Sequence, residues 1–190
     1  DVASEFGLVT GHVFGDGSAV NGSTPELRRC GWAFCQVEPH GEGRVVASCH
    51  DPLPGIIQEV PLAELYALLM AVRHCSPEGP LVFHTDCRFV VDGFAAGRAG
   101  TTAGTCVFAG TWSALWDAVD DVGPERIEVR CVKGHATRAD VQRGVLTAWE
   151  RKGNHTADKG AKQGALLHPD LSAVLAAHER KETAVTMLAR

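Results

Sequence analysis

The fold is decided by the stretch Leu81-Val82-Phe83-His84-Thr85-Asp86-Cys87-Arg88-Phe89-Val90-Val91-Asp92-Gly93. Its first apolar residues follow a Gly-Pro pair and predict a short buried strand. From residue 89 the apolar spacing changes to that of a helix. Asp86 therefore lies between a strand and a helix, at the edge of the sheet where α/β proteins bind ligands. The structural alternative is that Asp86 is a helix N-cap.

The bulk composition predicts one folded domain with a proper core. The chain has 190 residues, of which 45% are hydrophobic and 22% charged, values that are ordinary for a globular protein. No apolar run approaches the length of a membrane span, and the first ten residues lack a signal-peptide pattern. Because the chain begins with Asp1 rather than Met, we expect it to be an excised or processed piece of a longer protein.

The cysteines and the charges give two further expectations. None of the seven cysteines forms a C-x-x-C pair, so we expect free thiols in an intracellular, reducing compartment. The net charge is −5, but residues 123–164 carry nine Lys/Arg against five Asp/Glu. This local excess indicates an anionic partner. A solvated basic face is the alternative.

The hydrophobic pattern and the turn signals place the secondary structure. In chain order we predict strands at 8–14, 31–37 and 44–49, a helix from 61, a strand at 81–83, helices from 89 and 112, a strand at 127–132, and helices from 153 and 171. The first three strands form an antiparallel meander. Residues 97–110, rich in Gly, Ala and Thr, are expected to form a flexible loop. We assign 1–165 to one domain and 166–190 to a C-terminal helical extension.

Acidic residues occupy comparable places in four of these elements. Asp16 closes the first strand, Glu64 and Asp158 lie near the starts of helices, and Asp86 follows the fourth strand. Local structure offers an alternative for two of them, because Asp is common in turns and the first turn of a helix favours an acid. If the four converge, their repulsion requires divalent cations, and Mg²⁺ prefers such oxygen ligands. Two ions about 4 Å apart can activate a water and stabilise a leaving oxygen.

Five motifs in the expected order resemble the signature of type 1 ribonuclease H. They are Asp16-Gly17-Ser18, Ala63-Glu64-Leu65, Thr85-Asp86, Val132-Lys133-Gly134-His135 and Asn154-x-x-Ala157-Asp158. The resemblance covers roughly residues 9–165. The run 58–68 is similar to ribonuclease H domains of retroelement polyproteins.

The resemblance implies a fold, a reaction and a set of partners. The fold would be an α/β ribonuclease H-like fold with a five-stranded mixed sheet flanked by helices. The reaction would be endonucleolytic hydrolysis of the RNA strand of an RNA–DNA hybrid, leaving 5′-phosphate and 3′-hydroxyl ends. A reverse transcriptase would be covalently linked in a longer polyprotein, and no membrane would be involved.

The same resemblance assigns roles to residues. Asp16, Glu64, Asp86 and Asp158 would hold two Mg²⁺ or Mn²⁺ ions, and His135 would assist proton movement or product release. The expected substrate contacts are Ser18, Arg88, Lys133, Arg138 and Asn154.

The sequence departs from the family pattern at several places. Val60, Pro61 and Leu62 stand where polar amides often read the minor groove, and residues 97–110 contain a single cation, Arg98, where some members have a basic handle. The loop between His135 and Asp158 carries basic residues that could replace this handle. Two alternatives stay open. One is another enzyme of the same superfamily, a DEDD exonuclease or an integrase, although Lys133-Gly134-His135 and Glu64 favour ribonuclease H. The other is a degenerate domain that binds nucleic acid or acts as a structural module of a polyprotein.

Overall fold

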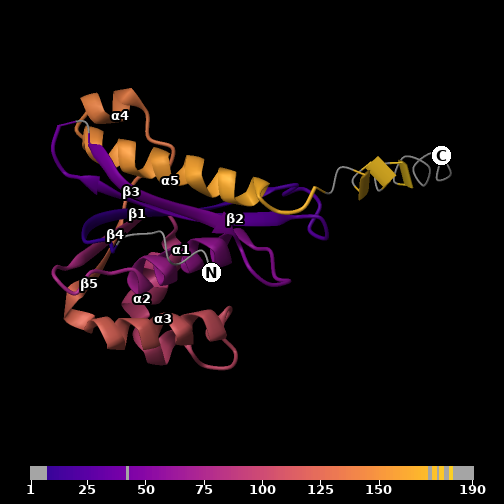
Figure 1. The fold of residues 1–190 in the computed structure, drawn as a ribbon, viewed down its shortest axis with the longest axis horizontal. Coiled ribbons are helices and arrows are strands. Elements are labelled where there is room, and N and C mark those ends of the chain that lie inside the picture. The colour runs from indigo at the N-terminus through magenta and orange to yellow at the C-terminus, as the bar shows by residue number, and fades with distance from the viewer. Residues whose placement is uncertain (1–7, 42, 171–172, 175, 178–179, 182–190) are drawn as a thin grey trace.

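A five-stranded mixed sheet forms the centre of the computed structural model, which describes residues 8–41, 43–170, 173–174, 176–177 and 180–181. Its order is β3-β2-β1-β4-β5 (Figure 1). The strands are β1 (Gly11–Val20), β2 (Arg29–Glu38), β3 (Arg44–Pro52), β4 (Leu81–Thr85) and β5 (Ile127–Cys131). β1, β2 and β3 are antiparallel, whereas β4 is parallel to both β1 and β5. The predicted fold class is therefore confirmed.

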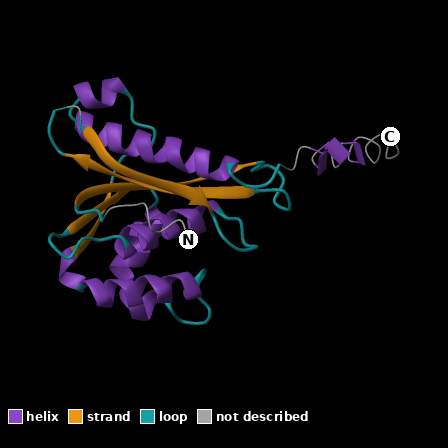
Figure 2. Ribbon diagram, viewed as in Figure 1, coloured by secondary structure: helices purple, strands orange, loops and turns teal. Residues whose placement is uncertain are grey.

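Helices cover both faces of the sheet (Figure 2). They are α1 (Val60–Arg73), α2 (Arg88–Thr101), α3 (Ala109–Val122), the short 3₁₀ helix η2 (Pro124–Arg126), α4 (Arg138–Gln142) and α5 (Ala148–Leu166). α5 packs on β1, β2 and β3 from one side, and α1 packs on the other side with α3 behind it. No helix of the described residues is long and apolar enough to cross a membrane.

The two faces of the sheet bury separate apolar cores. The larger core, which includes Phe83, Leu65 and Trp112, fills the space between the sheet and helices α1 to α3. A smaller one lies under α5 and contains Phe14, Cys35, Val37 and Ala157. At about 25 cal/mol per Å² of buried apolar surface, these clusters are the main force that holds the helices on the sheet.

α5 lies unusually close to the sheet. A Cβ at Gly31 would be 2.0 Å from the backbone nitrogen of Ala165, and one at Gly164 would be 2.5 Å from the carbonyl oxygen of Asp51. Such contacts are possible only without side chains, so glycines on both partners let the helix backbone rest on the strand backbone.

Several predicted boundaries were wrong. The first strand does not end before Asp16: β1 continues to Val20, so Asp16-Gly17-Ser18 is paired with β2 and is no turn. The expected loop 97–110 is half helix, because α2 continues past a kink at Gly97 to Thr101 and α3 begins at Ala109, so that the loop is confined to residues 102–108. The segment expected to be a basic loop forms α4 and the first turn of α5, whose predicted start at 153 was also too late.

The cysteines and the C-terminal extension complete the comparison with the sequence. All seven cysteines are free thiols, and Cys30, Cys35, Cys49 and Cys75 are buried. The predicted last helix, from 171, lies largely outside the described residues; those described within it are helical.

Candidate active site

Asp16 is placed at the sheet edge by the pairing of the two central strands. β1 and β4 are parallel, with Phe14 level with His84. Two residues further, the same register brings Asp16 on β1 level with Asp86, just beyond the end of β4 at Thr85. Asp16 is buried and its Oδ1 accepts a hydrogen bond of 2.9 Å from the backbone N–H of Gly17. The strand register thus brings the first and third acids together.

Glu64 reaches these two acids because α1 lies against the end of β1. A Cβ at Gly17 would be only 2.6 Å from the backbone nitrogen of Glu64, so this glycine permits the close approach of helix and strand. Thr85 on β4 donates a hydrogen bond of 3.3 Å to Oε2 of Glu64. α1 begins at Val60, with Pro61 near its start as predicted, so Glu64 lies in the second turn. The interpretation of Glu64 as a first-turn acid was therefore wrong.

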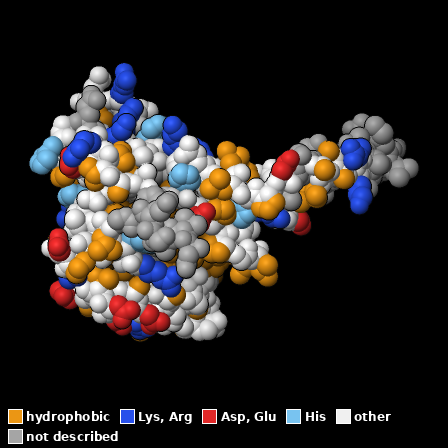
Figure 3. Space-filling view, viewed as in Figure 1, with side chains coloured by type: hydrophobic (Ala, Val, Ile, Leu, Met, Phe, Trp, Pro, Cys, Tyr) orange, Lys and Arg blue, Asp and Glu red, His pale blue; other side chains and the backbone are white. Residues whose placement is uncertain are grey.

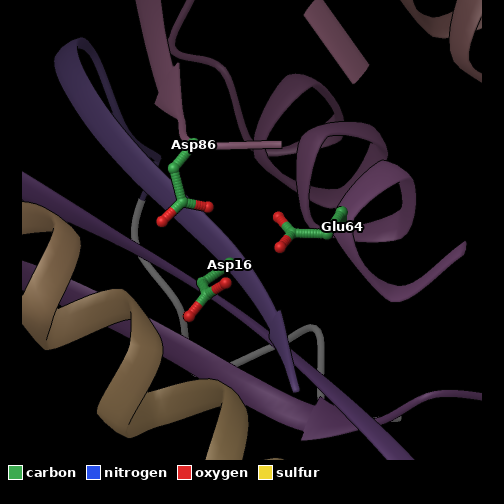
Figure 4. A group of neighbouring side chains, drawn as sticks. All are labelled: Asp16, Glu64 and Asp86. Carbon is green, nitrogen blue, oxygen red and sulfur yellow. The ribbon is translucent and has the colours of Figure 1, made fainter. Parts of the chain in front are cut away.

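Asp86 completes a cluster of three carboxylates. Oxygens of Asp16, Glu64 and Asp86 lie within 4.8 Å of one another, and Figure 4 shows the side chains pointing toward a common centre. Asp86 does not cap α2, whose N-cap residue is Cys87 with no side-chain cap hydrogen bond. Oδ2 of Asp86 instead accepts a hydrogen bond of 3.1 Å from the Asn154 amide on α5. The helix-cap alternative for Asp86 was wrong.

Burial and mutual repulsion make this cluster favour protons or cations. Burial, followed by repulsion from Asp86 and Asp158, raises the pKa of Asp16 to about 7. Burial and the neighbouring Asp16 carboxylate also raise the pKa of Glu64 well above its usual value. The Oδ1 atom of Asn154 beside them is buried and has no hydrogen-bond partner among the described residues. This set of oxygen acceptors fits a divalent cation.

The fourth predicted acid, Asp158, has a different partner. It lies on α5 and borders the same cavity, but it is outside the group of three. Its Oδ1 is 2.7 Å from Nζ of Lys162, one turn further along the helix. The structure therefore brings three of the four acids into contact distance and leaves Asp158 at the rim, paired with a cation.

His135 lies on a short loop that passes directly over Asp86. The backbone N–H of Val132 still bonds to the carbonyl of Thr85, and the chain then leaves β5. A Cβ at Gly134 would be 2.4 Å from Oδ2 of Asp86. His135 follows in the left-handed region, with φ of 48°, and is exposed. A histidine on such a loop can approach the acid cluster from the solvent side.

One cavity of about 420 Å³ connects these residues. The predicted site residues that line it are Asp16, Ser18, Glu64, Asp86, His135, Asn154 and Asp158. Sequence reasoning missed Lys162 and His155, which line the cavity too. Lys162 could have been found, because it follows Asp158 by four residues on a predicted helix.

The other three expected substrate contacts lie away from this cavity. Arg88 is exposed at the start of α2. Lys133 forms an ion pair of 2.6 Å with Asp140. Arg138, the first residue of α4, lines a second cavity beside α5. The basic residues of the predicted segment therefore do not share one environment: Lys133 is paired with an acid, whereas Arg138 faces a second cavity.

Comparison with known proteins is consistent with a nuclease fold that carries acids at the sheet edge. The sequence pattern of the RNase H family matches residues 10–166. The chain therefore belongs to the RNase H family. Family and fold together support ribonuclease H activity. The comparison with curated proteins finds no match.

Solved structures show the same fold at low sequence identity. The solution structure of the PFV RNase H domain is 20% identical, with a TM-score of 0.66 over 85% of this chain and 97% of that one. The native prototype foamy virus protease–reverse transcriptase is 21% identical, with a TM-score of 0.65 over 83% of this chain and 21% of that chain. LC11-RNase H1 in complex with an RNA/DNA hybrid is 10% identical, with a TM-score of 0.55 over 81% of this chain and 95% of that chain.

Proposed function

We propose that this protein is a metal-dependent endoribonuclease that hydrolyses the RNA strand of RNA–DNA hybrids, leaving 5′-phosphate and 3′-hydroxyl ends. The observation that carries the proposal is the group of three carboxylates within 4.8 Å at the sheet edge, in a chain that matches the RNase H family over residues 10–166. One solved relative of the same fold is described in complex with an RNA/DNA hybrid. Because other relatives are protease–reverse transcriptases, we propose a reverse transcriptase as the linked partner.

Two Mg²⁺ or Mn²⁺ ions are the proposed cofactors. Asp16, Glu64 and Asp86 would hold them. Asp158 would join these ligands when a metal ion displaces Lys162 from its carboxylate. Bound there, the ions would supply an activated water and neutralise charge at the leaving oxygen.

The remaining residues have the following proposed roles. Asn154 fixes the Asp86 carboxylate through its hydrogen bond, and Thr85 fixes Glu64 in the same way. His135, on the exposed loop over Asp86, assists proton movement or product release. Ser18 borders the cavity and contacts the substrate backbone. Arg88, at the surface outside this cavity, contributes positive charge toward the phosphates, and Lys133 does so when it exchanges Asp140 for a phosphate.

A cleavage assay tests the proposal. The purified chain is incubated with a hybrid that carries a 5′-labelled RNA strand, in Mg²⁺, Mn²⁺ or EDTA. We expect internal RNA cuts with either metal and none in EDTA, and no cutting by Asp86→Asn. The same RNA as a single strand, and with an RNA complement, should stay intact. Binding of the hybrid without any cleavage would instead support the degenerate, non-enzymatic alternative.

A further inference from the structure

A second cavity, separate from the acid cluster, lies between the β2–β3 turn and helices α4 and α5. Its volume is about 610 Å³, and it shares no lining residue with the acid cavity. Arg138 of α4 and Arg151 and Lys152 of α5 line it, and Gly43 forms part of the opposite wall. In Figure 3, Lys and Arg side chains gather over this end of the molecule, whereas Asp and Glu side chains gather over α3.

The walls of this cavity are held in place by close packing. At Gly43, φ is 83° and an added Cβ would lie 3.1 Å from Cβ of Trp149, so the turn rests directly on α5. On the other side, Thr137 and Asp140 form a capping box that fixes the first turn of α4. The cations therefore surround a built depression rather than a loose surface.

The three cations in the cavity are the ones that internal acids leave free. Asp140 is buried and forms ion pairs of 2.6 Å with both Lys133 and Arg143. Among the described residues, no ion pair engages Arg138, Arg151 or Lys152, and none of the residues that line the cavity is a carboxylate. Nε of Arg151 is buried without a hydrogen-bond partner there. Three cations and no carboxylate line the cavity, so it is arranged to receive an anion.

The same sorting of charge applies at the opposite end of the molecule. Arg98, the single cation of residues 97–110, is bound by Asp117 at 2.9 Å and by Asp120 at 2.7 Å. The charge of Arg98 is therefore neutralised, whereas that of Arg138, Arg151 and Lys152 beside α5 is available.

The position of the cavity relates it to the acid site. Arg151 and Asp158 are seven residues apart on α5, which is two turns of helix, so they share one face at a separation of about 10 Å along the axis. A nucleic-acid strand advances about 3.4 Å per nucleotide. A strand that runs along α5 from the acid site would therefore bring a phosphate to the cavity after about three nucleotides.

We propose that this cavity binds one backbone phosphate of the hybrid, about three nucleotides from the phosphate that is cut. Arg138, Arg151 and Lys152 hold it by charge-assisted hydrogen bonds. Lys133 and Arg143 do not take part, because Asp140 holds both. The identity of the ligand as a hybrid rests on the proposed function.

The first test measures binding and its salt dependence. Affinity for a labelled hybrid is measured in EDTA, where cutting is not expected, for the wild type and for Arg151→Gln/Lys152→Gln. We expect the double variant to bind at least about tenfold more weakly, because each charge-assisted contact contributes about that factor. The slope of log affinity against log salt should fall by about 1. The matched control, Arg143→Gln, should stay within about twofold of the wild type, and melting temperatures should show that both variants fold.

The second test locates the phosphate. Each phosphate of either strand is replaced in turn by an uncharged methylphosphonate. One position about three nucleotides from the cut should weaken wild-type binding, and the same replacement should not affect the double variant. When the wild type cleaves hybrid but both proteins show equal affinity, slope and position profile, the phosphate site is refuted and the proposed function stands. When one methylphosphonate position weakens wild-type binding and the double variant binds more weakly, but the wild type never cleaves the hybrid, the phosphate site stands and the proposed enzymatic function is refuted. When the wild type does not bind hybrid, both are refuted.

Discussion

Lys162 holds Asp158 by an ion pair of 2.7 Å across one turn of α5. Asp158 borders the cavity that contains the other three acids, so a cation of the protein itself occupies a carboxylate that metal binding would use. Both side chains are partly exposed, and such pairs contribute about 0.3–0.5 kcal/mol. The pair is weak enough for a divalent ion to displace.

Removing this competitor should strengthen metal binding. In Lys162→Met we expect the midpoint of a Mg²⁺ titration, followed by calorimetry, to fall about twofold, in line with the loss of a pair of this strength. Lys159→Met, an exposed change on the same helix, is the control and should leave the midpoint unchanged. A midpoint at higher Mg²⁺ concentration in Lys162→Met would mean that the lysine orders the Asp158 carboxylate instead of competing with the metal ion for it.

Gly134 leaves no room for a side chain above Asp86. In Gly134→Ala the new Cβ would be 2.4 Å from Oδ2 of Asp86, so either the loop or the carboxylate must move. We expect hybrid cleavage to fall at least about tenfold, because a displacement of about 1 Å at a reacting centre can cost more than that. Gly22→Ala, at an exposed position with no atom within 4 Å of the added Cβ, should retain full activity. Equal rates for the two variants would show that the loop adapts freely.

The acid cluster should be a source of instability without metal and of stability with it. Asp86→Asn removes one charge beside Asp16 and Glu64, so the metal-free variant should melt at the same temperature as the wild type or about 2–4 °C higher. Added Mg²⁺ should raise the melting temperature of the wild type and have little effect on the variant. The control Asp121→Asn, exposed on α3, should respond to Mg²⁺ as the wild type does. Identical metal responses in Asp86→Asn and the wild type would refute metal binding by this cluster.

A buried histidine should make the fold sensitive to acid. His84 is 2% exposed, stacks on Phe14, and has Nε2 2.9 Å from Nδ1 of His12. Burial and the neighbouring His12 lower the pKa of His84 to about 4. The usual pKa of histidine is 6.5, so as the pH falls the unfolded chain binds a proton at His84 before the folded protein does. Stability from this group is complete above pH 6.5 and is lost as the pH falls toward 4, by up to about 3 kcal/mol.

Urea unfolding at several pH values checks this expectation. Asp16 acts in the opposite direction in the same range, because its folded pKa is raised. The wild type must therefore be compared with His84→Phe, which should lose less stability than the wild type between pH 6.5 and 4. His50→Gln, at an exposed position, should follow the wild type. Parallel curves for the wild type and His84→Phe would contradict the assignment.

The sequence predicted the order of the elements, and the elements in turn indicated that Asp16, Glu64 and Asp86 would meet, because the elements depend on local signals. The apolar run before Asp86 and Pro61 ahead of Glu64 mark a strand and a helix without reference to the rest of the chain. The boundaries failed where tertiary contacts outweigh local preference. Gly17 looked like turn chemistry, yet in β1 it makes room for α1. Glycines and alanines near 97–101 looked flexible, yet they continue α2 after a kink.

The charges were harder to predict, because pairing is a property of the fold. Arg138, Arg143 and Arg151 are equivalent in the sequence as basic residues of one segment. Asp140 separates them, since it is close enough to bind Arg143 and leaves the other two free. Nothing in the spacing alone indicates that one acid would be buried and hold two cations.

The glycine contacts between α5 and the sheet have a consequence for how the protein can change over time. One helix carries Asn154 and Asp158 at the acids and Arg151 at the second cavity, and its C-terminal end rests on the strand backbone at Gly31 and Gly164. A single residue inserted between Arg151 and Asn154 would rotate one part about 100° relative to the other. The close backbone contacts of Gly31 and Gly164 hold the end of α5 on the sheet, so the helix could not turn to absorb that rotation. The spacing between the two sites should therefore tolerate no insertion or deletion within α5, whereas the loops around the sites can vary in length.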